Sequence, residues 1–254
     1  MKKIVPLLIA LSILKFSYSQ AGFNLDKKIK LENKEFVGTD PTENLYYYEN
    51  NILTKKTERE TYTYSNFNFG PISQVDIRNP FAITVFYKNY NLVIILDNKL
   101  NPIDKIRIPH DIDFVSSAET NQIWTYDKGT RCIERYNYKN KRLVFKSMPI
   151  TEIEEIEEMQ GSPENLYLRT RNAVLSYNNL GIQIQRIDKT GVLGFQQTKK
   201  SISLHTKDSI SSPVFQTTAI KNLEVKAIKK LVALDQKLII YDGNELYFFS
   251  VEKK

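Results

Sequence analysis

The sequence predicts an all-β protein, a β-propeller of six blades that its N-terminal strand closes. Short apolar strands followed by polar turns recur along the chain. The centres of the strands that resemble one another fall at Tyr46, Val85, Trp124, Tyr167, Ser203 and Ile239. Their spacings are 39, 39, 43, 36 and 36 residues, and a period near 40 with about four strands per unit is typical of propeller blades. The last unit holds three strands, while one strand stands alone before the first unit.

The second unit, Ile72–Ile108, shows the pattern most clearly. It contains an inner strand, Ile72–Ile77, followed by Ile83–Lys88, Leu92–Asp97 and Ile103–Ile108. Strands of this kind carry more apolar surface than one sheet can bury by itself, so they need neighbours of the same kind. The repeat along the chain provides those neighbours.

The remaining units follow the same plan. They run from Lys34 to Ser65, from Ile112 to Ser147, from Ile153 to Ile187 and from Val192 to about Leu223. The fifth is rich in Ser, Thr and Lys and its fourth strand is unclear, so five blades stay the alternative to six. A β-sandwich or an open meander would explain the strands but not the period.

The two ends of the chain complete one blade. The last unit offers Ala227–Leu234, Lys237–Tyr241 and Glu245–Val251, and the strand Phe23–Leu31 has no partner in its own neighbourhood. Adding this strand to the last three closes the ring and removes an exposed edge. Residues 21–254 are therefore expected to form a single domain.

One segment departs from the strand pattern. Thr151–Met159 has apolar residues at 153, 156 and 159 and four Glu between them. This spacing predicts a short helix that replaces or precedes an inner strand. Its glutamates are expected to form a solvated face rather than an acidic site for a cation or a basic partner.

Residues 1–20 have the features of a secretory signal peptide. Lys2 and Lys3 precede the apolar stretch Ile4–Leu14, which is too short to span a bilayer, and Ser17-Tyr18-Ser19 provides small residues for cleavage. Cleavage after Ser19 would leave Gln20 at the N-terminus, where it can cyclise to pyroglutamate. The sequence thus predicts an exported, periplasmic protein without a transmembrane segment in its mature chain.

Charge and cysteine content narrow the function further. The formal charge of +7 falls to +4 without the three signal lysines, and Lys and Arg are spread along the chain. Nucleic acid is therefore not an expected partner. Cys132 is the only cysteine, so no internal disulfide exists, and we expect it to be a small buried side chain on a strand rather than a catalytic thiol.

Residues for catalysis or metal binding are few. The two histidines, His110 and His205, lie far apart in sequence, and no HExxH, GxSxG, CxxC or P-loop motif occurs. His110, Asp111 and Asp113 are close enough in sequence to form a metal site, but they are better explained as a polar turn before a strand. Aspartates after strands, at 76, 97, 111, 127 and 242, are interpreted as turn residues and not as calcium ligands. We expect no cofactor, no metal and no catalytic residue.

Aromatic and basic residues on connecting loops indicate a partner-binding face. Phe67 and Phe69 fall between two blades and share one side if the segment is extended; they either fill the domain core, the favoured interpretation, or form an anchor on the rim. Loops that join one blade to the next lie on the same face as loops between second and third strands. Besides the two phenylalanines, this face gathers His110, Lys128, Arg169, Arg171, His205 and Lys207. The predicted partner-binding residues are Phe67, Phe69, His110, Arg169 and Arg171.

The signal segment ending in SYSQ, the Lys-, Ile- and Asn-rich composition and strand pairs such as VIILDNKLNPIDKI resemble those of exported propeller proteins of Bacteroidota. In size and export the chain is similar to the plug component of the type IX secretion translocon. This resemblance implies a non-enzymatic gate on the periplasmic side of an outer-membrane barrel, with the barrel or its subunits as partner. It covers the whole chain in style, without a diagnostic motif.

Two other function classes remain open. Small secreted propellers include glutaminyl cyclases, but the chain lacks the FTQGL-like signature of that family, and a shared fold does not establish an activity. A glycan-binding propeller would expose tryptophan, and Trp124, the single tryptophan, lies within a predicted strand. A protein-binding module is the first expectation.

Overall fold

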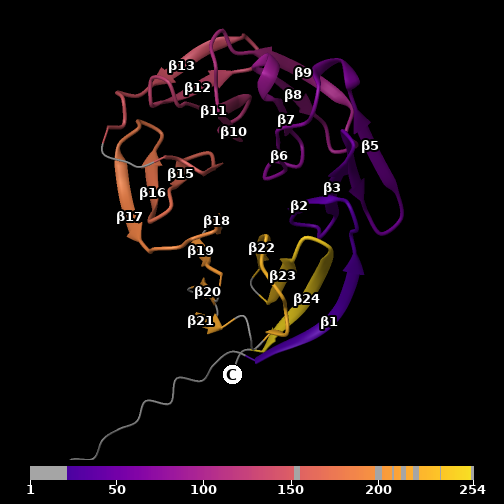
Figure 1. Ribbon diagram of the computed structural model, residues 1–254. Coiled ribbons are helices and arrows are strands. Elements are labelled where there is room, and N and C mark those ends of the chain that lie inside the picture. Colours follow the sequence, from indigo (N-terminus) through magenta and orange to yellow (C-terminus); the bar gives the residue numbers. More distant parts are fainter. Residues whose placement is uncertain are drawn as a thin grey trace, which may run out of the picture.

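The computed structural model describes residues 22–151, 155–197, 202–207, 209–212, 216–219, 223–234 and 236–252. These residues form six four-stranded antiparallel sheets that surround a central axis as the blades of a propeller (Figure 1). The predicted fold class is therefore confirmed, with six blades rather than five. The predicted signal peptide, residues 1–20, lies outside the described residues.

Each blade places its first strand nearest the axis. Blade 1 consists of β2 (Glu35–Thr39), β3 (Leu45–Glu49), β4 (Ile52–Lys56) and β5 (Thr61–Ser65). Blade 2 consists of β6 (Gln74–Asp76), β7 (Ile83–Tyr87), β8 (Leu92–Leu96) and β9 (Pro102–Arg107), with 3₁₀ turns η1 (Phe67–Phe69) before it and η2 (Lys88–Tyr90) within it. Blade 3 consists of β10 (Phe114–Ser117), β11 (Gln122–Asp127), β12 (Cys132–Asn137) and β13 (Arg142–Lys146).

The second half of the chain repeats the plan. Blade 4 consists of β14 (Glu158–Gly161), β15 (Asn165–Arg169), β16 (Ala173–Asn178) and β17 (Gln183–Asp188). Blade 5 consists of β18 (Gly194–Gln197), β19 (Ile202–His205), β20 (Ser209–Ser212) and β21 (Gln216–Ala219). Blade 6 consists of β22 (Lys230–Ala233), β23 (Lys237–Tyr241), β24 (Glu245–Glu252) and, outermost, β1 (Gly22–Lys30).

The N-terminal strand closes the ring as the sequence predicts. β1 pairs antiparallel with β24, from Phe23 opposite Val251 to Ile29 opposite Leu246, and a bulge after Leu25 shifts the register. Blade 6 is thus built from both ends of the chain (Figure 1). Its completion covers the edge of β24 that would otherwise be free to pair with another chain.

The core lies between the blades. Six hydrophobic clusters each combine residues of two neighbouring blades, including the pair formed by blades 6 and 1. β7 and β8 of blade 2 are buried along their full length. Val85 packs towards blade 1 and Phe86 towards blade 3. Because both faces of the blade are covered, the strands read as continuous apolar runs rather than as alternating ones.

The helix predicted for Thr151–Met159 is wrong where the structure describes it. Residues 155–157 are irregular, residues 158 and 159 begin β14, and residues 152–154 lie outside the described residues. Ile156 and Met159 are buried in the cluster between blades 3 and 4. Their apolar spacing therefore reflects the entry into an inner strand. Glu157 and Glu158 are held by Arg169, so this acidic run is only in part the solvated face that we expected.

Candidate functional site

We call the surface formed by the blade-to-blade loops and the loops between second and third strands the connector face. Phe67 and Phe69 lie on it in η1, whose N-cap Asn66 accepts a hydrogen bond from the backbone N–H of Asn68 at 3.0 Å. The segment is therefore a 3₁₀ turn and not the extended stretch we predicted. As a result the two rings point to different surroundings.

Phe69 fills the core while Phe67 faces solvent. The ring of Phe69 makes edge contacts with Tyr87 and Tyr90, with centroids 5.5 and 5.6 Å apart, and packs on the cluster between blades 1 and 2. Phe67 is 68% exposed. Core packing is thus confirmed for Phe69, whereas the role of the exposed Phe67 as an anchor stays a prediction.

The loop that carries Phe67 is fixed from the neighbouring blade. Asn51, in the turn between β3 and β4, donates from Nδ2 to the carbonyl of Gly70 at 2.8 Å and accepts from the N–H of Ile72 at 2.8 Å. Gly70 has φ of 68°, a conformation that glycine adopts without cost. Phe67 is therefore an exposed aromatic side chain on an ordered loop.

The predicted basic residues separate into buried and exposed ones. Arg169 and His205 lie at the connector-face ends of β15 and β19, but they are only 7% and 2% exposed. Arg171 is exposed in the next turn. Burial, with repulsion from Arg169 as a second cause, lowers the pKa of His205 to about 4. Arg169 pairs with Glu157 and Glu158 and therefore has a structural role. The sequence did not reveal this role, because these partners lie at the entry into β14.

His110 contacts the buried carboxylate of Glu134 instead of forming a metal site. Its Nε2 lies 2.8 Å from Oε2 of Glu134, whose other oxygen accepts from Nζ of Lys146 at 2.7 Å. Asp111 accepts from Nδ2 of Asn91, and Asp113 pairs with Lys88 at 2.7 Å. His110, Asp111 and Asp113 therefore have separate partners. Within the described ranges no group of three or more His, Cys, Asp or Glu side chains has the arrangement of a metal site.

The turn interpretation of the aspartates is confirmed for Asp97, Asp127 and Asp242. Each accepts backbone N–H bonds from residues two to four positions later. Asp76 accepts the same kind of bond, from the N–H of Arg78 at 2.9 Å, but it is also buried and accepts from Nη2 of Arg78 at 2.7 Å and from the N–H of Ser117 at 2.8 Å. Burial alone would raise the pKa of Asp76, but Arg78 and these hydrogen bonds outweigh it and hold the pKa below its usual value.

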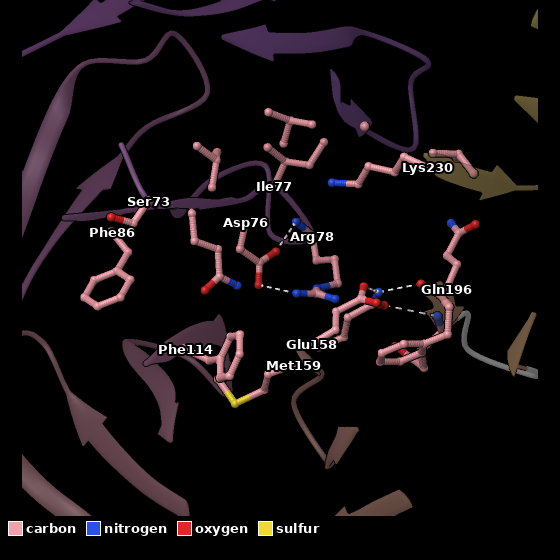
Figure 2. Close-up of a pocket in the computed structure, with 18 of the residues that line it drawn as sticks. Ser73, Asp76, Ile77, Arg78, Phe86, Phe114, Glu158, Met159, Gln196 and Lys230 are labelled. Atoms are coloured by element: carbon pink, nitrogen blue, oxygen red, sulfur yellow. Dashed lines mark hydrogen bonds and ion pairs between the residues drawn. The ribbon is translucent and has the colours of Figure 1, made fainter. Parts of the chain in front are cut away.

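The innermost strands surround a cavity of about 380 Å³ (Figure 2). All six contribute to its wall, which also includes residues that lead into these strands. Its charged lining residues are Asp76, Arg78, Lys88, Asp113, Glu157, Glu158 and Lys230. A second cavity of about 210 Å³ shares Lys230 and Gln74 with it and contains Glu35. The centre of the propeller is thus a polar space that the sequence analysis did not predict.

Polar side chains link neighbouring inner strands around this cavity. Gln74 accepts from the N–H of Val115 at 3.1 Å, and Ser116 accepts from the N–H of Gly161 at 2.6 Å. Three further links follow the same direction: Asp76 accepts from Ser117, Gln160 from Gln197, and Gln196 from the N–H of Ala233. An inner strand has no further strand beside it, so these side chains bind some of its free N–H groups. Isolated polar residues in short apolar strands are the sequence signal that would have revealed them.

The single cysteine and the single tryptophan are both buried. Cys132 is buried, as predicted for a structural thiol. Trp124 is 0% exposed and lies between blades 3 and 4, with the guanidinium of Arg135 5.2 Å from its ring. It is therefore not accessible for stacking against a sugar.

Among the described residues no helix is long and apolar enough to cross a membrane.

Comparisons with known proteins place the fold. No family model matches the chain, and no curated protein matches it. Among solved structures it is similar to the WD40 β-propeller domain of Doa1, with a TM-score of 0.60 and 9% identity over 92% of this chain and 98% of that one. It is also similar to catalytically inactive virginiamycin B lyase from Staphylococcus aureus with quinupristin, with a TM-score of 0.58 and 8% identity over 90% of this chain and 99% of that one. A third similar structure is BBS1N in complex with ARL6DN, with a TM-score of 0.56 and 9% identity over 83% of this chain and 76% of that one. At these identities the likeness shows the propeller fold alone.

Proposed function

We propose that this chain is a non-enzymatic, exported propeller that binds a protein partner through its connector face. The observation that carries the proposal is Phe67, a large apolar side chain that is 68% exposed on a loop fixed by Asn51. Rigid aromatic side chains of this kind lose little entropy on binding and often supply most of the affinity of an interface. Phe69 supports the loop from below by packing on Tyr87 and Tyr90.

The charges of the connector face indicate the chemistry of the partner. Arg171, Lys207 and Lys226 are exposed there, and the part of the chain that the structure describes gives none of them an ion pair. We therefore expect an apolar pocket for Phe67 with acidic groups around it on the partner. His110 lies on the same face and is half-buried against Glu134.

The proposed partner is an outer-membrane barrel, and the proposed role is a gate on its periplasmic side. This follows the resemblance to the plug component of the type IX secretion translocon and the signal-like residues 1–20. A propeller with its edges closed suits such a role, because it offers a rigid disc whose loops are free for contacts. The WD40 domain of Doa1 and BBS1N, whose structure was solved in complex with ARL6DN, are similar to this chain in fold.

The wall of the central cavity supports a non-enzymatic role. Its lining residues include neither histidine nor cysteine. The carboxylates that line it, Asp76, Asp113, Glu157 and Glu158, each contact an arginine or lysine. General acid and base catalysis needs groups that can take up and release protons near neutral pH, and firmly paired carboxylates are poorly suited to it.

The proposal is tested by recovering tagged protein from the native cell envelope after crosslinking. We expect an outer-membrane barrel among the recovered proteins, and loss of about 10- to 30-fold in its recovery for Phe67→Ser. Phe81→Ser is the matched control, because Phe81 is 71% exposed but lies between β6 and β7, on the opposite face. Equal recovery with both variants, or recovery without any barrel, would overturn the proposal.

A further inference from the structure

The charges around the central cavity are balanced as a whole but not at every point. Arg78 neutralises Asp76 at 2.7 Å, and Lys88 neutralises Asp113 at 2.7 Å. Elsewhere Arg169 is shared by two carboxylates, so that side of the cavity keeps one negative charge. Lys230 carries one positive charge on the other side (Figure 2).

Arg169 contacts Glu157 at 2.5 Å and Glu158 at 3.0 Å. The amide of Gln160 donates to Glu158 at 2.8 Å as well. The side chains of Glu157 and Glu158 are 38% and 30% exposed, whereas the side chain of Arg169 is 8% exposed. The surplus negative charge is therefore on the accessible side of this cluster, within reach of a cationic group in the cavity.

Lys230 presents its ammonium group to the same cavity without a direct ion pair, although the charge of Glu158 attracts it from a distance. Within the described ranges its Nζ has no hydrogen bond and no ion pair, and the side chain is exposed. Figure 2 shows the amine directed into the cavity from β22. The solvent that this side chain meets is the solvent of the cavity, because inner strands surround it, and the resulting desolvation lowers the pKa of Lys230.

Two amides add hydrogen-bond donors to the wall of the same cavity. Gln74 and Gln196 line the cavity and use their oxygens to bind Val115 and Ala233. This leaves the NH₂ group of each amide as a donor, and the described residues give neither NH₂ group a partner. A cation and amide donors in the wall of one cavity are groups that can bind a carboxylate.

We propose that the central cavity binds a small zwitterion, an amino acid or a short peptide, with its carboxylate on Lys230 and its ammonium group on Glu157 and Glu158. A ligand without net charge suits a wall whose own charges cancel. A dianion such as phosphate would meet one unpaired cation and several carboxylates, which disfavours it. The volume of about 380 Å³ lies at the lower end of the range for small-molecule sites.

This inference is independent of the proposed protein-binding function. The cavity is built from inner strands, whereas Phe67 lies on a loop between blades 1 and 2. Loss of ligand binding in the cavity and loss of partner binding at the connector face can therefore be measured separately. A change at Lys230 is expected to leave recovery of the protein partner unchanged.

The test uses the mature protein and three probes, measured by isothermal titration calorimetry and saturation-transfer NMR. L-alanyl-L-alanine carries both charges, its C-terminal amide lacks the carboxylate, and its N-acetyl derivative lacks the ammonium group. We expect one dipeptide per chain to bind, and each modified probe to bind at least about tenfold more weakly, since a charge-assisted hydrogen bond contributes at least that factor. No binding up to about 10 mM, far above the range of a specific site, would overturn the proposal, as would equal binding of the three probes.

Variants of one side chain complete the test. Lys230→Gln should weaken dipeptide binding about tenfold or more and remove the advantage of the dipeptide over its amide, whereas Lys230→Arg should keep both. Lys226→Gln is the control, because Lys226 is an exposed lysine that lines neither cavity. Because Lys230 has no hydrogen bond and no ion pair among the described residues, the melting temperature should change little. Unchanged binding in Lys230→Gln would show that the site is elsewhere.

Discussion

Lowering the pH should destabilise this protein through one buried histidine. His205, at the end of β19, is 2% exposed, and its Nδ1 has no hydrogen-bond partner among the described residues. Burial, and repulsion by Arg169 after it, lowers the pKa of His205 from 6.5 to about 4. The folded protein therefore keeps this imidazole neutral at pH values at which the unfolded chain binds a proton.

The size of the effect follows from the two pKa values. Above pH 6.5 the imidazole is neutral in both states, and it contributes no pH dependence to the free energy of unfolding. As the pH falls from 6.5 to about 4, only the unfolded state gains the proton, and the folded state loses relative stability throughout this interval. At about 1.4 kcal/mol for each pH unit the full loss is about 3.5 kcal/mol, of which about 2.5 kcal/mol is reached by pH 4.5.

Urea unfolding at pH 7 and at pH 4.5 measures this loss. Other groups also titrate in the interval, so the comparison is between the wild-type protein and His205→Gln, which cannot gain the proton. We expect the free energy of unfolding to fall by about 2 to 3 kcal/mol more in the wild type than in the variant. His110→Gln, the change at the only other histidine, should retain the wild-type loss at His205. If the wild type and His205→Gln lose the same amount, the burial argument for His205 is wrong.

Two further predictions concern the closure of the ring. Gln160→Leu removes the side chain that accepts from the N–H of Gln197 and donates to the carbonyl of Phe195 at 2.6 Å. It should lower the free energy of unfolding, measured in urea, by about 1–3 kcal/mol. Gln185→Leu on the exposed strand β17 should change it little, and equal losses in the two variants would contradict the role of Gln160. Deleting residues 22–30, the strand β1, uncovers the edge of β24 and should lower the melting temperature and cause association with rising concentration. Light scattering that shows a monomer with unchanged melting temperature would refute this.

The candidate site could be predicted from the sequence only in part. Phe67 and Phe69 were identified because aromatic residues on a connecting loop stand out from the strand pattern. Which of them faces solvent depends on the 3₁₀ turn that Asn66 caps, and an extended segment would have placed both on one side. Arg169 was expected on the surface, but the route of the chain before β14 brings Glu157 and Glu158 to it.

The sequence by itself determined the blades and their closure. Apolar runs such as β7 and β8, with a polar turn after each, can only be buried between similar sheets, and the period of about 40 residues limits the number of such sheets to five or six. The structure shows six. Only the tertiary structure decided what the centre contains. Lys230 and Gln196 are about 35 residues apart and belong to different blades, and nothing in their local sequence indicates that they share a cavity. They meet because closing the ring brings six inner strands around one axis, and that proximity is a property of the closed ring and not of any one blade.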